Sequence, residues 1–420
     1  MSLSGFLDTL RERGFIEQTT DEAALEKLFS DGGESVSAYI GFDPSSSSLH
    51  VGSLVPIMAL VHLQRCGHRP IALVGGGTGR VGDPSGKTEL RKMLGEDSVD
   101  ENLLGISNQL SRYLELSEAG SEADSEADSQ NAGFAVDNAE WLLGLNYVDF
   151  LRDIGRHFSV NRMLSAESVK LRIDSESGLS FLEFNYSILQ AYDFLVLNQR
   201  YGCQVQMGGS DQWGNIVNGM ELGRRMDGSE LFGLTTPLLT TADGGKMGKT
   251  ASGAVWLNEA QLPNYDFWQY WRNVDDRDVG RFLRLFTDLD LAEIARLEAL
   301  EGAQINEAKT VLANEVTTLV RGAEAARLAE RTAAETFAGG GAGSDLPTLA
   351  VGADGMRIGA VLTELGFTAS NGEAKRKLAE GAVKLDGAVI TEPGHLVTVA
   401  QGSECKLSLG KKKHAIIRAQ

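Results

Sequence analysis

The sequence predicts an α/β protein whose first part is built on a parallel β-sheet. Between residues 35 and 239, short apolar runs alternate with amphipathic stretches of helical length, which is the pattern of repeated strand–helix–strand units. Several of these apolar runs end in glycines and polar side chains. Because ligands bind beyond the carboxyl ends of parallel strands, these strand ends are the candidate functional positions.

The rest of the chain divides into a helical part and a small final domain. Residues 263–337 are rich in Ala, Leu, Glu and Arg with helical periodicity, and the glycine-rich run at 339–344 ends this pattern. We therefore expect four segments: a sheet domain at residues 1–239, a helical domain at 240–337, a flexible linker at 338–355 and a small α+β domain at 356–420.

The composition fits a globular protein of two or three domains without a membrane segment. Of the 420 residues, 42% are hydrophobic and 23% charged, and no apolar run reaches the roughly 20 residues that span a bilayer. The N-terminus lacks the basic start and apolar core of a secretion signal. Three widely spaced cysteines lack metal-ligand spacing, so we expect a cytoplasmic protein with no protein metal site.

Charge is distributed unevenly along the chain. The net charge of −19 argues against a general nucleic-acid binder, yet residues 356–420 contain ten Lys or Arg against six Asp or Glu. We therefore expect RNA contacts mainly in this basic segment. Residues 117–133 repeat Glu-Ala-Asp-Ser, and we interpret them as a solvated surface excursion, with a functional acidic tail as the alternative.

The elements of the sheet domain follow from short patterns. Residues 36–42 are predicted as a strand and residues 51–65 as the helix after it. Residues 70–74 and 203–207 are predicted as further strands, and each runs directly into glycines. The predicted sheet thus carries glycines at the ends of neighbouring strands, where a ligand can approach the backbone closely.

Two segments nearly two hundred residues apart indicate a site for a nucleoside triphosphate. Residues 49–53, Leu-His-Val-Gly-Ser, open a predicted helix, where a histidine and the helix N-terminus can stabilise phosphate oxygens. Residues 246–250, Lys-Met-Gly-Lys-Thr, offer two lysines and a hydroxyl that can close on pyrophosphate as it forms. Each segment alone also fits an ordinary surface turn, whereas the pair favours chemistry that expels pyrophosphate.

A glycine-rich stretch at residues 75–87 joins a predicted strand to a helix. It lacks the spacing of a P-loop. Asp83 suits an ammonium group or a ribose, and Lys87 and Arg91 are placed to reach phosphate or the end of an RNA. A simple connector between strand and helix is the alternative.

Three polar side chains share one face of the helix predicted at residues 181–201. Tyr186, Gln190 and Asp193 are spaced i, i+4 and i+7 among apolar neighbours. An unpaired Asp193 in such surroundings would be costly. Either an internal polar network satisfies it, or an amino-acid ligand with a phenolic hydroxyl does so, with Tyr186 and Gln190 reaching the ammonium group of that ligand.

Residues 208–215 join another predicted strand to a helix through glycines. Asp211 is placed to bind ribose hydroxyls, and Gln212 to contact an amino acid. A helix-capping role for Asp211 is the alternative, and the two roles are compatible.

These motifs together resemble those of the class I aminoacyl-tRNA synthetases and, over essentially the whole chain, those of the bacterial-type tyrosyl-tRNA synthetases. The matching stretches are Gly-Phe-Asp-Pro at 41–44, His-Val-Gly-Ser at 50–53, Gly-Asp-Pro-Ser-Gly-Lys at 82–87, Gln-Ala-Tyr-Asp-Phe at 190–194, Gly-Gly-Ser-Asp-Gln-Trp-Gly-Asn at 208–215 and Lys-Met-Gly-Lys-Thr at 246–250. The resemblance implies a Rossmann-like catalytic domain, a helical anticodon-side domain and, through residues 370–392, a small RNA-binding domain shared with a ribosomal protein of the small subunit.

The resemblance also implies roles for individual residues. The tyrosine substrate would be held by Tyr39 and Asp193 at its phenol, by Asp83, Tyr186 and Gln190 at its ammonium group with Asn138 in support, and by Gln212 near its carboxylate. The nucleotide would be held by Gly41, Asp43, Ser45, His50, Gly52, Gly209, Asp211 and Lys249. The residues acting on the phosphates would be His50, Lys87, Arg91, Lys246, Lys249 and Thr250, and those contacting RNA would be Lys375, Arg376, Lys377 and Lys384.

The implied reaction has two steps. The tyrosine carboxylate attacks the α-phosphate of ATP and expels pyrophosphate, and the terminal ribose of tRNA(Tyr) then takes the tyrosyl group. The resemblance implies Mg²⁺ on the ATP phosphates and a homodimer whose interface includes much of residues 131–178. It implies no membrane partner.

Three departures from the family pattern and three rival readings accompany this resemblance. Ser53 replaces the second histidine of the first signature, Met247-Gly248 and Thr250 depart from the class-wide second signature, and Thr241 stands where some relatives carry lysine. A tryptophanyl-tRNA synthetase is the rival within the class, disfavoured by Asp193. A catalytically silent RNA-binding paralogue and an unrelated nucleotidyl transferase are the rivals outside it.

Overall fold

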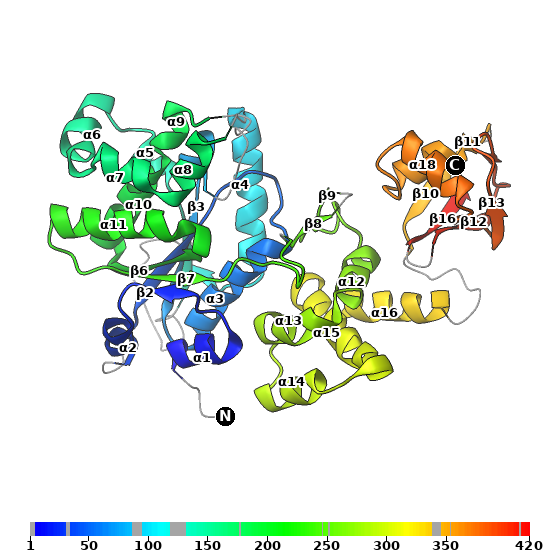
Figure 1. Ribbon diagram of the computed structural model, residues 1–420, viewed down its shortest axis with the longest axis horizontal. Coiled ribbons are helices and arrows are strands. Elements are labelled where there is room, and N and C mark those ends of the chain that lie inside the picture. The colour runs from blue at the N-terminus through cyan, green and yellow to red at the C-terminus, as the bar shows by residue number, and fades with distance from the viewer. Residues whose placement is uncertain are drawn as a thin grey trace. The chain divides into compact units, whose positions relative to one another are not determined.

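The chain folds into two units, residues 1–239 and 240–420 (Figure 1). The computed structural model describes residues 5–30, 34–85, 95–117, 132–175, 178–245, 247–250, 253–337, 346–352, 354–410 and 413–420, of which it gives the backbone alone at 96–97, 167–168, 249–250, 253 and 336–337. Most of the acidic repeat lies outside these residues. None of the helices within them is long and apolar enough to cross a membrane.

The first unit is built on a mainly parallel sheet, as predicted. Among the described residues its strands lie in the order β1-β7-β6-β2-β3-β5-β4, and only β1 runs antiparallel to its neighbour. The strands are β1 (Gln18–Thr19), β2 (Ser37–Phe42), β3 (Arg69–Val74), β4 (Leu116–Ser117), β5 (Gly133–Asp137), β6 (Cys203–Gly209) and β7 (Phe232–Thr236). The chain leaves β2 toward β3 on one side and returns in β6 on the other, so a crevice forms at the carboxyl end of β2.

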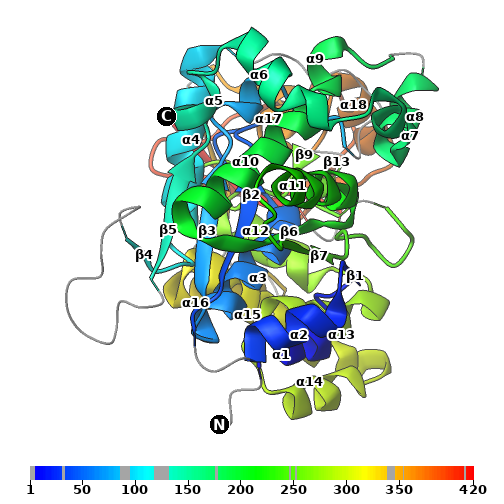
Figure 2. The ribbon, with the colours of Figure 1, turned by 90° about the vertical axis from the view of Figure 1, so that its left-hand side faces the viewer.

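Helices cover both faces of this sheet (Figures 1 and 2). The helices that come before β5 in the chain are α1 (Phe6–Arg13), α2 (Glu22–Ser30), η1 (Val51–Ser53), α3 (Leu54–Arg65), η2 (Thr78–Arg80) and α4 (Glu96–Leu110). Those that complete the unit are α9 (Phe181–Phe184), α10 (Tyr186–Tyr201), η4 (Ser210–Gln212) and α11 (Trp213–Met226). Because successive side chains of a strand point to opposite faces, Tyr39 of β2 packs with Ile71 of β3 and Phe194 of α10 on the α10 side.

The single helix expected at residues 181–201 is two helices, α9 and α10, separated at Asn185. Ser180 caps α9 reciprocally with Glu183, which fixes the start of the short helix. Glu183 also pairs with Arg172 at 3.1 Å, and both side chains are buried. The buried ion pair therefore ties α9 to the segment before it, and the three polar side chains predicted to share a face all lie in α10.

The segment between β5 and α9 consists of short helices. They are α5 (Ala139–Leu142), α6 (Tyr147–Asp153), η3 (Gly155–His157), α7 (Val160–Ser165) and α8 (Glu167–Ile173). A small apolar cluster that includes Ile154, Met163 and Ile188 packs this segment against α10. The same segment also carries exposed apolar side chains, such as Val148 and Leu171.

The first part of the second unit is mainly helical, as expected. A short hairpin of β8 (Lys249–Thr250) and β9 (Gly253–Ala254) precedes its helices. The helices are α12 (Asn264–Arg272), η5 (Asp276–Asp278), α13 (Val279–Phe286), α14 (Leu291–Glu298), η6 (Gly302–Gln304), α15 (Ile305–Arg321) and α16 (Ala323–Phe337). Trp271 is buried at their centre, with its ring in contact with those of Phe282 and Phe286.

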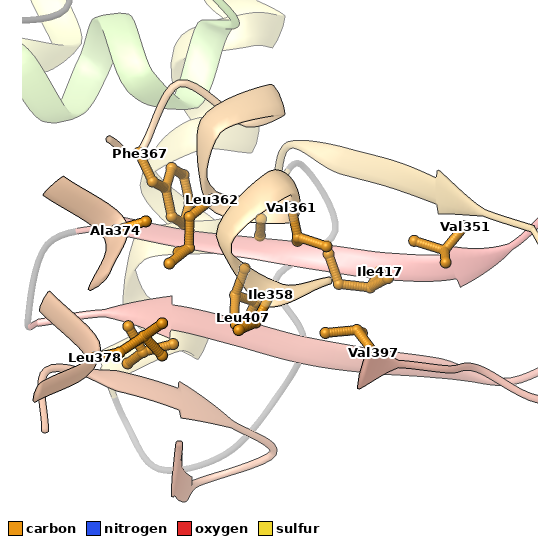
Figure 3. Close-up of a cluster of buried hydrophobic side chains, with 12 residues drawn as sticks. Val351, Ile358, Val361, Leu362, Phe367, Ala374, Leu378, Val397, Leu407 and Ile417 are labelled. Carbon is orange, nitrogen blue, oxygen red and sulfur yellow. The ribbon is translucent and has the colours of Figure 1, made fainter. Parts of the chain in front are cut away.

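The C-terminal part of the second unit is an α+β fold with its own core (Figure 3). Its elements are β10 (Thr348–Val351), β11 (Met356–Arg357), α17 (Ile358–Glu364), α18 (Asn371–Ala379), β12 (Val383–Leu385), β13 (Ala388–Ile390), β14 (Leu396–Val397), β15 (Glu404–Leu409) and β16 (Lys413–Ala419). Figure 3 shows Ile358, Leu362 and Leu407 facing one another between the helices and strands.

The expected linker at residues 338–355 is too long at its C-terminal end. Residues 348–351 form β10, which pairs in parallel with β16, and Val351 belongs to the buried core. The pairing partner of this short edge strand lies far along the chain, so the local sequence gives little indication that the strand forms. The small domain therefore begins before residue 356.

Candidate active site

A cavity of about 190 Å³ lies at the carboxyl ends of β2, β3 and β6. This is the crevice that the strand order creates. The cavity is lined by Tyr39, Ile40, Gly41, Phe42, Asp43, Pro56, Leu73, Gly75, Thr78, Asp83, Asn138, Tyr186, Gln190, Asp193, Gln206, Met207, Gly208, Gly209 and Gln212. Ten of these residues were predicted from the sequence to bind a substrate, seven of them tyrosine and three the nucleotide. The structure therefore brings residues predicted for both substrates into one cavity.

Asp193 forms a buried acceptor at the inner end of the cavity. Its side chain is 1% exposed, and it accepts hydrogen bonds from Asn138 Nδ2 at 3.0 Å and from Trp141 Nε1 at 2.7 Å. Burial raises the pKa of Asp193 to about 8, although the two hydrogen bonds oppose this increase. The carboxyl group is therefore held in one orientation in apolar surroundings.

The hydroxyl of Tyr39 lies buried in the same cavity wall. Within the described part of the chain it has no hydrogen-bond partner. Burial raises the pKa of Tyr39 well above its usual value, and the charge of Asp193 adds to this increase. A buried polar atom without a partner is costly, so a ligand hydroxyl that bonds to Tyr39 and Asp193 would be strongly favoured here.

A second polar cluster contributes Asp83, Gln190 and Gln212 to the cavity lining. Gln212 Nε2 donates to Asp83 Oδ2 at 2.7 Å, and Asn215 Nδ2 donates to the carboxamide oxygens of Gln190 at 3.0 Å and Gln212 at 3.1 Å. The donor of Asn215 thus fixes which end of each glutamine carries the oxygen. A carboxylate and two oriented carboxamides form a site suited to an ammonium group.

Asp43 is the acidic group at the end of β2. Its two oxygens accept hydrogen bonds from Thr78 Oγ1 and from the Tyr186 hydroxyl, each at 2.8 Å. Burial raises the pKa of Tyr186 well above its usual value, as does the nearby charge of Asp43. The absence of a side chain at Gly75 permits this arrangement, because a Cβ there would lie 2.2 Å from Asp43 Oδ1.

His50 caps the short helix η1 through its ring. The backbone N–H of Gly52 donates to His50 Nδ1 at 3.0 Å. A Cβ on Gly52 would lie 2.7 Å from the ring, so Gly52 makes room for His50. Nucleotide binding at Gly52 stays a prediction.

The remaining predicted residues divide by position. Ser45, His50, Gly52 and Asp211 belong to the same unit but do not line the cavity. Lys87, Arg91 and Lys246 lie outside the described residues, and Lys249 and Thr250 are described by their backbone only, in β8 of the second unit. Lys375, Arg376 and Lys377 lie on α18 and Lys384 on β12 of the C-terminal fold.

The site residues that escaped the sequence-based prediction include Thr78, Trp141, Gln206 and Asn215. Thr78 sits inside a glycine-rich loop, and that composition is the only local signal it offers. Trp141 follows Asn138 by three residues, which is the spacing of one helix face. Asn215 is the last residue of the motif at 208–215, in which only Gly209, Asp211 and Gln212 were given roles.

The described residues contain no group of three His, Cys, Asp or Glu side chains arranged to hold a metal ion. Several polar groups of the cavity are paired with one another, whereas the Tyr39 hydroxyl and Gln206 Oε1 have no partner among the described residues. The arrangement is therefore one that binds and orients a ligand with a buried hydroxyl at one end and an ammonium group near its middle.

Comparison with known proteins identifies the family. The family model for tRNA synthetases of class I (W and Y) matches residues 31–338 of this sequence. The chain belongs to this family. Among curated class I synthetases it is 60% identical over 415 residues to the tyrosine–tRNA ligase of Novosphingobium aromaticivorans, which covers 99% of this chain and 98% of that protein. It is 56% identical to that of Rhodospirillum rubrum, with the same coverage.

Solved structures of class I synthetases share the fold. A C-terminally truncated mitochondrial tyrosyl-tRNA synthetase of Aspergillus nidulans superposes with a TM-score of 0.69 at 29% identity, covering 80% of this chain and 95% of that one. The truncated mitochondrial enzyme of Coccidioides posadasii gives a TM-score of 0.65 at 32% identity, covering 78% and 91%. A tryptophanyl-tRNA synthetase of Encephalitozoon cuniculi, with a TM-score of 0.52 at 13% identity, shares the fold alone.

Proposed function

We propose that this synthetase is a tyrosine–tRNA ligase that activates tyrosine with ATP and transfers it to tRNA. The observation that carries the proposal is the buried pair of Asp193 and Tyr39 in the cavity wall. Asp193 accepts hydrogen bonds, and the Tyr39 hydroxyl is left to bond a ligand. A phenolic hydroxyl satisfies both groups, whereas the ring of phenylalanine leaves them unmatched.

In the proposed first step an oxygen of the tyrosine carboxylate attacks the α-phosphorus of ATP. A new P–O bond forms as the bond to the β-phosphate oxygen breaks, so the products are tyrosyl-adenylate and pyrophosphate. In the second step a hydroxyl of the terminal tRNA ribose attacks the tyrosyl carbonyl and AMP leaves. No protein side chain needs to form a covalent bond, so the protein contributes positioning and charge stabilisation.

We assign the ammonium group of tyrosine to Asp83, Tyr186 and Gln190, with Gln212 beside the carboxylate. The nucleotide is assigned to Asp43 with Gly41, Gly209 and Asp211. Ser45, His50, Lys87, Arg91, Lys246, Lys249 and Thr250 are assigned to the phosphates by family resemblance, with ATP entering as its magnesium complex. We expect the enzyme to act in the cytoplasm, where tRNA is charged.

Amino-acid-dependent exchange of pyrophosphate into ATP tests this proposal. We expect exchange with tyrosine, and none above background with phenylalanine or tryptophan. Lys246→Ala is expected to lower the tyrosine-dependent rate by at least about a hundredfold, because it removes charge stabilisation from the leaving pyrophosphate. Lys27→Ala, on an exposed position of α2, is the matched control. Exchange with tryptophan instead of tyrosine would contradict the assignment of Asp193.

The C-terminal fold is the proposed tRNA-binding element outside the catalytic unit. Lys375, Arg376 and Lys384 are exposed on α18 and β12, in a segment whose net charge is positive in an otherwise acidic protein. Phosphate contacts by such side chains release counterions, so tRNA binding should weaken with salt. This charge pattern favours a tRNA partner at that fold over general nucleic-acid binding.

We also propose that two copies of the chain associate through residues 139–184, which comprise the short helices α5 to α8 and α9. The exposed apolar side chains of this segment, between 40 and 69% exposed, are Leu143, Tyr147, Val148, Leu151, Val160, Leu164, Leu171, Ile173, Phe181 and Leu182. Exposed apolar side chains concentrated in one segment are typical of a protein interface, and most homodimers use the same patch on both subunits. The occupant proposed for it is therefore a second copy of this chain.

Phe181→Asp is expected to convert the dimer to a monomer, because it places a charge in an apolar interface. Sedimentation equilibrium should then give the chain mass of 45.1 kDa in place of twice that value. Leu104→Asp is the control, since Leu104 is 68% exposed on α4, outside the segment. A wild-type protein that sediments as a monomer at micromolar concentration would contradict the proposal.

A further inference from the structure

A continuous chain of hydrogen bonds joins the two ends of the cavity. Asn138 Nδ2 donates to Asp193 Oδ2 and to Thr78 Oγ1, both at 3.0 Å. Thr78 Oγ1 donates in turn to Asp43 Oδ1 at 2.8 Å. Thr78 is 2% exposed, so its hydroxyl is shielded from competing water. The residue proposed to hold the tyrosine phenol is thus linked through two side chains to the residue proposed to hold the nucleotide.

The direction of each hydrogen bond in this chain is fixed. The Asn138 carboxamide oxygen accepts from the backbone N–H of Gly77 at 2.8 Å, so its NH2 group must face Asp193 and Thr78. Because Thr78 accepts from Asn138, its single hydroxyl hydrogen is left for Asp43. The orientation of one end of the chain therefore determines the orientation of the other.

A second link reaches Asp43 from the tyrosine side. The Tyr186 hydroxyl donates to Asp43 Oδ2 at 2.8 Å, and a ligand ammonium group would bind the lone pairs of that same hydroxyl. Asp43 is thus held by one donor from each part of the proposed amino-acid site. Thr78 differs from Tyr186 in that it is not assigned to either substrate, so its removal affects the link and not a substrate contact.

We propose that Thr78 is a positioning residue that couples tyrosine binding to ATP binding. The inference rests on the proposed function. Tyrosine bound at Asp193 and Tyr186 restrains Asn138, and through Thr78 it restrains the carboxylate of Asp43. When ATP binds second, the Asp43 carboxylate is already ordered. ATP binding then loses less conformational entropy. By thermodynamic linkage, ATP strengthens tyrosine binding by the same factor.

The coupling factor, by which each ligand changes the affinity of the protein for the other, measures this link directly. Full-length protein is titrated calorimetrically with tyrosinol, which lacks the reacting carboxylate, and with α,β-methylene-ATP, each alone and in the presence of the other. For the wild type we expect each ligand to tighten the other by roughly tenfold, within the usual range for coupled sites. Thr78→Val, which keeps the shape and removes the hydroxyl, is expected to bring the factor close to one. Thr78→Ser, which keeps the hydroxyl, is expected to retain it.

A purely structural role for Thr78 would give a different result. It would weaken each ligand alone and lower the melting temperature, but it would leave the ratio of affinities unchanged. If Thr78→Val does not fold, Thr78→Ala removes the same hydroxyl with less bulk. A coupling factor that persists in the folded variant, or a wild-type factor of one, overturns the inference while leaving the proposed function intact. A wild type that binds neither tyrosinol nor the ATP analogue overturns the proposed function itself.

Discussion

Asp193→Asn is expected to remove most of the preference for tyrosine over phenylalanine. The asparagine amide must turn an N–H toward Asn138 or Trp141, both of which already donate to position 193. Each unmatched buried donor costs about 1–3 kcal/mol, so kcat/KM for tyrosine should fall by about ten- to a hundredfold while the value for phenylalanine changes little. Pyrophosphate exchange with both amino acids measures the ratio.

Asp100→Asn provides the control for this change, because Asp100 is an exposed carboxylate on α4. It should leave the exchange rate with tyrosine at the wild-type level. An Asp193→Asn enzyme that keeps its preference for tyrosine would show that selection occurs elsewhere in the cavity, and the central role given to the buried carboxyl would be wrong.

The same substitution has a pH-dependent effect on stability. Burial raises the pKa of Asp193 from 3.8 to about 8, so between these values the folded protein holds a proton that the unfolded chain has lost. The contribution of this group to stability is therefore complete below pH 4 and decreases by roughly 1.4 kcal/mol per pH unit until pH 8. The melting temperature of Asp193→Asn relative to wild type should rise between pH 5 and pH 8 and level off above. A difference that is constant with pH would contradict the raised pKa.

Gly75→Ala is expected to damage the nucleotide side of the site selectively. The added Cβ would lie 2.2 Å from Asp43 Oδ1 and 2.5 Å from Thr78 Oγ1, so the Asp43 carboxylate must turn away from its donors. Displacement of a binding group by about 1 Å typically costs about a hundredfold in rate. We expect kcat/KM for ATP to fall by about that factor, with a smaller change in KM for tyrosine.

Gly144→Ala is the matched control, because a Cβ at Gly144 meets no atom within 4 Å. Steady-state exchange at varied ATP concentration distinguishes the two variants. Equal kinetics for Gly75→Ala and wild type would mean that Asp43 does not need its present orientation to bind the nucleotide.

Local sequence patterns were sufficient to place β2, β3 and β6, of the seven strands described in the first sheet, and the polar face of α10. The period of the helix puts Tyr186, Gln190 and Asp193 on one side, and the glycines after β3 and β6 mark the strand ends. These features depend on neighbouring residues only. The parallel sheet and the position of the cavity follow from them, because parallel strands present their carboxyl ends at one edge.

Contacts between distant segments could not be read in this way. Asp193 is held by Trp141, and Asp43 by Thr78, across dozens of residues of chain. Periodicity tells which face a side chain occupies but not which side chain from another element meets it there. The same limit explains β10, whose pairing with β16 extends the C-terminal fold into the expected linker.

We expect the buried pair of Asp193 and Tyr39 to select tyrosine for activation. This selection can be measured in a single-turnover reaction with ATP and equal concentrations of tyrosine, phenylalanine and tryptophan, with the enzyme-bound adenylate identified by mass spectrometry after quenching. We predict tyrosyl-adenylate as the only adenylate detected. Tryptophanyl-adenylate, a mixture of adenylates in proportion to supply, or no adenylate from folded protein would each contradict this expectation.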